Sequence, residues 1–160
     1  MNKTSTGAPF LDQFLAGGYD SDIITTVYGP SGSGKTNLCL IAAVYCARSG
    51  KKVLFVDTEG GIAVERIKQI CPDYEPVLER LHFFNPMTFE EQKALFEQLR
   101  SLVNEHIGLI IVDSISMLYR LELGKSEDVY DINSSLGRQI AYLVEIARRK
   151  KIPVLLKTQV

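Results

Sequence analysis

The sequence predicts an α/β protein with a mostly parallel sheet and helices on both of its faces. Short apolar runs alternate with amphipathic stretches along the chain, and most of the runs lack the polar–apolar alternation of a half-exposed strand. Runs and stretches follow the order β-α-β-α-β-α-β-α-β, which is typical of an open, doubly wound sheet. The length of 160 residues suits one domain over 1–160.

The five expected strands are the apolar runs, each bounded by glycine, charged or turn residues. Four of them are almost wholly apolar, which favours parallel strands that are buried on both faces. In chain order, the expected strands cover 23–28, 53–56, 81–84, 109–112 and 154–156.

Amphipathic stretches between these runs predict four helices. The first covers 37–49, and the second covers 62–71 and stops before a proline. The third follows the capping-box spacing of Thr88 and Glu91. The fourth has apolar residues at the spacing of one helix face, namely Leu136, Ile140, Leu143, Val144 and Ala147.

The connection 114–133 lacks a clear hydrophobic period, and we expect a long loop there. A loop of this length within a compact domain is usually functional or mobile. It contains Arg120 and Lys125, but its acidic residues outnumber them, which favours a solvated loop over a strong grip on nucleic acid. These acidic residues are Glu122, Glu127, Asp128 and Asp131.

The bulk composition limits the class of protein. A content of 46% hydrophobic and 23% charged residues is ordinary for a soluble globular chain, and a formal net charge of −1 gives no global reason for nucleic-acid binding. No apolar stretch can span a bilayer, and the first ten residues lack a signal-peptide core. The three cysteines form no C-x-x-C pair, which predicts buried free thiols and a reducing cytoplasm.

The segment "YGPSGSGKTN" has the P-loop pattern G-x-x-x-x-G-K-T between an expected strand and an expected helix. Average residue frequencies give a chance match in about 1% or less of chains this long, so we predict a phosphate site. Backbone N–H groups and the helix N-terminus would bind phosphate oxygens, Lys35 would bridge the outer phosphates, and the Thr36 hydroxyl would ligate Mg²⁺. The phosphate-binding residues are Gly29, Pro30, Ser31, Gly32, Ser33, Gly34, Lys35 and Thr36.

Polar residues at the ends of other strands are candidates for the rest of the site. Asp113 ends an apolar strand as a Walker B acid does, and the P-loop upstream favours a role in holding a metal-bound water, although on its own such an aspartate usually caps a helix or a turn. Glu59 could orient the attacking water and Asp57 could brace the turn, or both could be solvated turn residues. Gln159 could sense the γ-phosphate, although exposed glutamines are common.

Several segments in order resemble the RecA/RadA recombinase superfamily of P-loop ATPases. They are "STGAPFLDQFLAGGY", "VYGPSGSGKT", "VDTEGG", "LIIVDSI", "GRQI" and "TQV", from about Ser5 to Val160. The resemblance implies a RecA-like core in which Glu59 activates the water and Asp113 is the Walker B acid. Gln159 is the implied γ-phosphate switch, so that Glu59, Lys35 and Gln159 form the catalytic set.

Within the superfamily the chain is most similar to a short archaeal branch. The P-loop begins at Gly29, so we expect no helix-hairpin-helix DNA-binding domain ahead of it. Family members continue beyond the position of Val160, so we expect the chain to lack the C-terminal part. Another departure is Lys157-Thr158 where the family usually has Thr-Asn; this lysine could compete for the phosphate. In the family's strand order the P-loop strand lies beside the final strand, where it could form an unprotected edge.

The resemblance implies a slow, DNA-dependent ATPase of homologous recombination and DNA repair, with ATP and Mg²⁺ as cofactors. ATP state would modulate binding to DNA, single-stranded for preference, or to recombination proteins; a homo-oligomer is also compatible. Two alternatives stay open: an ATP-gated recombination mediator with negligible hydrolysis, and a KaiC-like or DnaB-like ring ATPase. Ring-shaped particles in electron micrographs would favour the latter.

Overall fold

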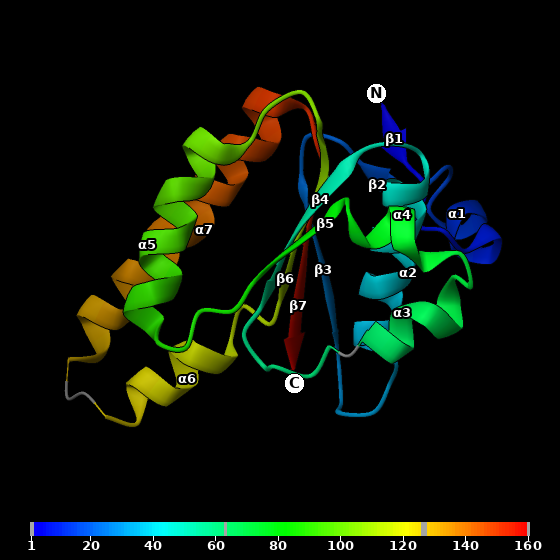
Figure 1. Cartoon of the computed structure of the whole chain (residues 1–160). Helices are drawn as coiled ribbons and strands as arrows, with labels where there is room; N and C mark the ends of the chain where they lie inside the picture. The colour runs from blue at the N-terminus through cyan, green and yellow to red at the C-terminus, as the bar shows by residue number, and fades with distance from the viewer. Residues whose placement is uncertain (1, 63, 126–127, 160) are drawn as a thin grey trace.

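Five parallel strands form the centre of the computed structural model, which describes residues 2–62, 64–125 and 128–159 (Figure 1). The order across the sheet is β3-β7-β6-β4-β5, so the P-loop strand is at the edge beside the final strand, as expected. This arrangement confirms the predicted RecA-like α/β class. The strands are β3 (Ile24–Gly29), β4 (Lys52–Asp57), β5 (Leu81–Phe84), β6 (Ile107–Asp113) and β7 (Val154–Gln159).

Helices cover both faces of the sheet, and Figure 1 shows it edge-on between them. On one face lie α2 (Lys35–Arg48), α3 (Val64–Ile70) and α4 (Tyr74–Leu78). On the other lie α5 (Phe89–Leu102) and α7 (Val129–Lys150). The remaining elements are α1 (Pro9–Phe14), the antiparallel pair β1 (Lys3–Thr4) and β2 (Tyr19–Asp20), and α6 (Met117–Leu123) near the carboxyl ends of the strands.

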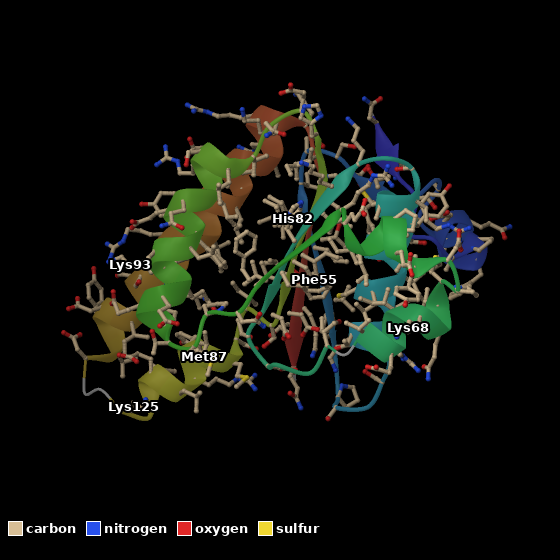
Figure 2. The ribbon with its side chains drawn as sticks, viewed as in Figure 1. Phe55, Lys68, His82, Met87, Lys93 and Lys125 are labelled. Atoms are coloured by element: carbon tan, nitrogen blue, oxygen red, sulfur yellow. The ribbon has the colours of Figure 1, made fainter. Side chains whose placement is uncertain are left out.

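Alternate residues of the central strands enter two separate apolar layers. In β4, Val53 and Phe55 pack in the layer that contains α2, whereas Leu54 and Val56 pack in the layer that contains α5 and α7. Phe55 is fully buried and lies in the middle of the molecule in Figure 2. This alternation matters for the site, because the residue two positions beyond Phe55 must emerge on the α2 face.

The structure corrects the sequence analysis mainly between 114 and 133. The stretch predicted to be one long loop contains α6 and the first residues of α7; within it, Glu127 lies outside the described residues. The short elements β1, α1, β2 and α4 were also missed. Strand and helix centres were predicted correctly and differ at their ends; within the predicted helix 62–71, Ala63 lies outside the described residues.

The "STGAPFLDQF" segment folds around one carboxylate. Asp12, in α1, accepts hydrogen bonds from the Ser5 hydroxyl and from the backbone amide and hydroxyl of Thr6, the latter two at 2.7 Å. Burial raises the pKa of this carboxyl, but the bonds from Ser5 and Thr6 outweigh burial and leave the pKa below its ordinary value. This motif therefore orders the chain before the sheet.

No helix in the described ranges is long and apolar enough to cross a membrane. The three cysteines, Cys39, Cys46 and Cys71, are buried free thiols, as predicted. Burial raises the pKa of Cys39 to about 12 and that of Cys46 to about 11, so neither is a reactive thiolate at neutral pH.

A buried amide pair joins the two helices on the α5–α7 face. The Gln92 side chain donates to that of Gln139 at 2.9 Å, and both are fully buried. We expect Gln139→Leu to lower the free energy of unfolding by about 1–3 kcal/mol, because the Gln92 amide N–H group loses its acceptor. Replacing both glutamines by leucine should recover much of that loss, because no buried donor is then left unpaired. Urea unfolding followed by circular dichroism measures both effects.

The matched control for this pair is Gln98→Leu, on the exposed side of α5, which should change stability by less than about 0.5 kcal/mol. A double variant that loses the sum of the two single losses would show that the glutamines do not act as a pair.

Candidate nucleotide site

Strand register brings the predicted polar residues together at the carboxyl ends of the parallel strands. Asp57 of β4 is level with Asp113 of β6, and Asp113 is level with Lys157 of β7. Two positions before each of them is a residue that packs in the α2 layer. Because side chains alternate along a strand, all three side chains point to the α2 face of the sheet. Gln159 is level with Gly29, where the P-loop begins. The strands end here and α2 starts beside them (Figure 1).

The P-loop turns tightly between β3 and α2. Gly32 and Gly34 have φ angles of +78° and +93°, in a region that side chains rarely adopt, and Gly34 is the N-cap of α2. The Lys35 ammonium folds back over the loop and donates to the Pro30 carbonyl at 2.6 Å and to the Ser33 hydroxyl at 3.3 Å. The loop is therefore held in shape by its own lysine.

The strand-terminal acids have different surroundings. Asp113 is 2% exposed, and its Oδ2 accepts from the Thr36 hydroxyl at 3.0 Å, which joins β6 to the start of α2. Asp57 Oδ1 accepts from the backbone amides of Glu59 and Gly60 at 3.1 and 2.9 Å. Asp57 thus braces the turn, as predicted, and leaves the Glu59 side chain directed to the site.

Lys157 lies at the centre of this group. Its Nζ is 2.7 Å from Asp113 Oδ1 and 2.9 Å from Glu59 Oε2, and it donates to Thr36 Oγ1 at 3.1 Å. Burial lowers the pKa of Lys157, but the hydrogen bonds to Asp113 and Glu59 outweigh burial and hold the pKa above its ordinary value. The ammonium therefore stays charged at neutral pH. We expected this lysine to compete for the phosphate; its contacts with the carboxylates of Asp113 and Glu59 were not predicted.

A pocket of about 340 Å³ opens above these residues. Gln159 is on its rim; the backbone carbonyl of this glutamine accepts from the Arg120 guanidinium of α6 at 2.6 Å. The Thr158 hydroxyl donates to that of Ser116 at 3.1 Å, a second link between β7 and the α6 segment. The pocket is lined by Ser31, Gly32, Gly34, Lys35, Thr36, Asn37, Glu59, Lys157 and Gln159.

The structure brings the predicted nucleotide residues together. Lys35, Thr36, Glu59 and Gln159 line one pocket, and Asp113 lies below it against Thr36. Two features were not predicted from the sequence. Asn37 lines the pocket, and Lys157 contacts oxygens of three residues at once. Asn37 carried no signal beyond its place after the motif, whereas the position of Lys157 follows from strand register.

The oxygens around Lys157 are chemically suited to Mg²⁺, but the Lys157 ammonium occupies the space between them. Thr36 and Asp113 supply a hydroxyl and a carboxylate, which this ion binds. The Lys157 ammonium contacts both, and Glu59 as well. Among the described residues, no three His, Cys, Asp or Glu side chains form a group that could hold a metal ion. The oxygen ligands therefore suit Mg²⁺, but the space between them has no room for the ion while the ammonium is there.

A P-loop between β3 and α2, with acids and a glutamine at the ends of neighbouring parallel strands, defines a RecA-like P-loop NTPase core. Within that class, the chain belongs to the Rad51 family, whose model matches residues 1–160.

Curated proteins with similar sequences support this family assignment. The "DNA repair and recombination protein RadB" of Methanococcus maripaludis strain C7 is 41% identical over 152 residues, which are 94% of this chain and 70% of the relative. The protein of the same name from Thermococcus gammatolerans is 40% identical over 160 residues, 98% of this chain and 69% of the relative. A crystal structure of the RadB recombinase superimposes with a TM-score of 0.84 at 39% identity, covering 98% of this chain and 70% of that one.

Proposed function

We propose that the chain binds ATP at the P-loop, hydrolyses it slowly, and acts in homologous recombination and DNA repair. The observation that carries the proposal is the bond from the Thr36 hydroxyl to Asp113, which joins the phosphate loop to the strand-terminal acids. Glu59 and Gln159 line the same pocket as the loop. Names of relatives as DNA repair and recombination proteins support the cellular role.

In this proposal the triphosphate binds across the loop and the start of α2. Backbone N–H groups of Gly32 to Thr36 donate to phosphate oxygens, and the positive end of α2 favours the negative charge. Lys35 exchanges its bond to the Pro30 carbonyl for bonds to the outer phosphates. Thr36 and Asp113 are the residues that would hold Mg²⁺ if the Lys157 ammonium withdrew from them, and the ion would then neutralise negative charge on the phosphates.

Glu59 is the proposed base, and Gln159 is the proposed γ-phosphate sensor. Glu59 Oε2 accepts a hydrogen bond from the Lys157 ammonium at 2.9 Å, so this oxygen must give up that bond before it can accept a proton from water. This contact supports slow turnover. Gln159 is joined through its carbonyl to Arg120 of α6, which offers a route from the pocket to a surface that binds DNA or a partner protein.

Glu59→Gln tests the hydrolytic part of the proposal. We expect ATP hydrolysis in the presence of single-stranded DNA to fall by about 100-fold or more, because an amide cannot accept the water proton. ATP affinity should change by less than about threefold, since the phosphate-binding groups remain. Phosphate release measures turnover, and a fluorescent ATP analogue measures binding.

The matched control for that variant is Glu105→Gln, whose side chain is 83% exposed in the turn before β6. It should leave both turnover and binding at the wild-type level. Unchanged turnover in Glu59→Gln would refute the assignment of Glu59, and loss of binding in Glu59→Gln would show a role in holding nucleotide instead.

A second function is favoured by the same Glu59–Lys157 ion pair, which has a distance of 2.9 Å. It is that of a recombination mediator whose ATP state gates partner binding with negligible hydrolysis. Undetectable wild-type turnover, together with ATP-dependent binding to DNA or to a recombinase of the same family, would select the mediator. Turnover stimulated by single-stranded DNA would select the ATPase.

A further inference from the structure

Lys157 is a buried lysine in the middle of a paired strand, unlike a lysine that forms an ion pair on the surface. Its side chain is 7% exposed, and that of Asp113 is 3% exposed. β7 has a strand on each side, β3 and β6, so the backbone of Lys157 is fixed by pairing on both sides. The ammonium group is therefore held where it is by the sheet and by three oxygen contacts.

Two of the three contacts are hydrogen bonds, to Glu59 and Thr36, and the contact with Asp113 is an ion pair. Nζ has three N–H donors, and three oxygens lie at 2.7, 2.9 and 3.1 Å, on Asp113, Glu59 and Thr36. The two carboxylates carry two negative charges, and the ammonium supplies one positive charge between them. Without it, the buried carboxylate of Asp113 and the carboxylate of Glu59 would lose the cation that both contact.

A divalent ion cannot share this position with the ammonium. Mg²⁺ requires oxygen ligands at about 2.0–2.1 Å, which would place it against an ammonium that contacts the same hydroxyl and the same carboxylates. The two cations would repel one another at a separation of a few ångströms in a partly buried site. Binding of the ion at Thr36 therefore requires that Lys157 leave all three oxygens.

We propose that Lys157 is a built-in cation that takes the place of Mg²⁺ between Thr36, Glu59 and Asp113, so that the chain binds metal-free nucleoside triphosphate. The inference rests on the proposed function, in that ATP binds at the P-loop. Lys35 and Lys157 both line the pocket, so two ammonium groups are available to a bound triphosphate. The ligand class is a nucleoside triphosphate without a bound divalent ion.

The test is the Mg²⁺ dependence of nucleotide affinity. A fluorescent ATP analogue is titrated against the full chain in millimolar Mg²⁺ and again in excess EDTA. We expect the two dissociation constants of the wild type to agree within about threefold. In Lys157→Met, which keeps a long unbranched side chain without the ammonium charge, affinity in EDTA should be lower than in Mg²⁺ by about tenfold or more.

The matched control is Lys52→Met, an exposed lysine at the start of β4, which should behave as the wild type. Lys157→Thr is the second variant, because a β-branched residue suits a strand if Lys157→Met does not fold. A large loss of wild-type affinity in EDTA overturns the inference in any case, and that measurement needs no variant to fold.

The outcomes separate this inference from the proposed function. Wild-type affinity that falls by more than about tenfold in EDTA overturns the inference and leaves ATP binding intact. Equal affinities in both conditions for Lys157→Met also overturn it, because the lysine then contributes no cation. Absence of nucleotide binding by the wild type in either condition overturns the proposed function and the inference together.

Discussion

Lys35→Ala is expected to reduce ATP affinity by about 100-fold or more, equivalent to about 2.7 kcal/mol. The Lys35 ammonium is 2.6 Å from the Pro30 carbonyl inside the loop, so it needs only to change partners to reach the outer phosphates. Charge-assisted bonds to phosphate are the strongest polar contacts that this pocket offers, and alanine removes them. Titration with a fluorescent ATP analogue measures the change.

Lys68→Ala is the control for this variant, because Lys68 lies on the outer side of α3 and away from the pocket (Figure 2). It should bind ATP as the wild type does. Circular dichroism should show the same helix content for Lys35→Ala and the wild type, since α2 is anchored by its buried residues. Wild-type affinity in Lys35→Ala would place the triphosphate elsewhere.

Phe55→Ala is expected to lower the free energy of unfolding by about 3–5 kcal/mol. Phe55 is fully buried, lies in the central part of the sheet, and packs against Phe83 with ring centroids 5.4 Å apart. Truncation removes apolar contacts and leaves a cavity between the sheet and α2 that close-packed neighbours can fill only in part. Urea unfolding gives the free energy directly, and the midpoint of thermal unfolding should fall as well.

The control for Phe55→Ala is Phe14→Ala in α1, where the phenylalanine is 82% exposed. The same chemical change there should cost less than about 0.5 kcal/mol. Equal losses at the two positions would contradict the layered core described above.

The residues of the candidate phosphate site could be located from the sequence because each of them follows a strand or lies in a glycine-rich loop between a strand and a helix. A glycine-rich loop between a strand and a helix is a phosphate cradle, and parallel strands end at one edge of the sheet. Asp113, Glu59 and Gln159 were each placed at or just beyond a strand end, and no further geometry was needed to bring them near Lys35.

The contacts of Lys157 could not be predicted in the same way. They depend on the register that pairs Asp113 with Lys157 across β6 and β7. A slip of one residue would move the lysine to the opposite face of the sheet. α6 was missed for a related reason: it is short, and it is held by packing of Leu118 against Phe89 and Ile132, which are distant in sequence. Local periodicity contains no trace of such contacts.

The link between β7 and α6 couples the pocket to the surface of α6. Because Arg120 is bonded to the Gln159 carbonyl and Thr158 to Ser116, a shift of the β7 end alters contacts of α6. Linkage is reciprocal: if ATP changes the affinity of the α6 surface for a second ligand by some factor, that ligand changes the affinity for ATP by the same factor. Under the proposed function, a DNA strand or protein that binds at α6 with such coupling would also change how often the pocket holds nucleotide.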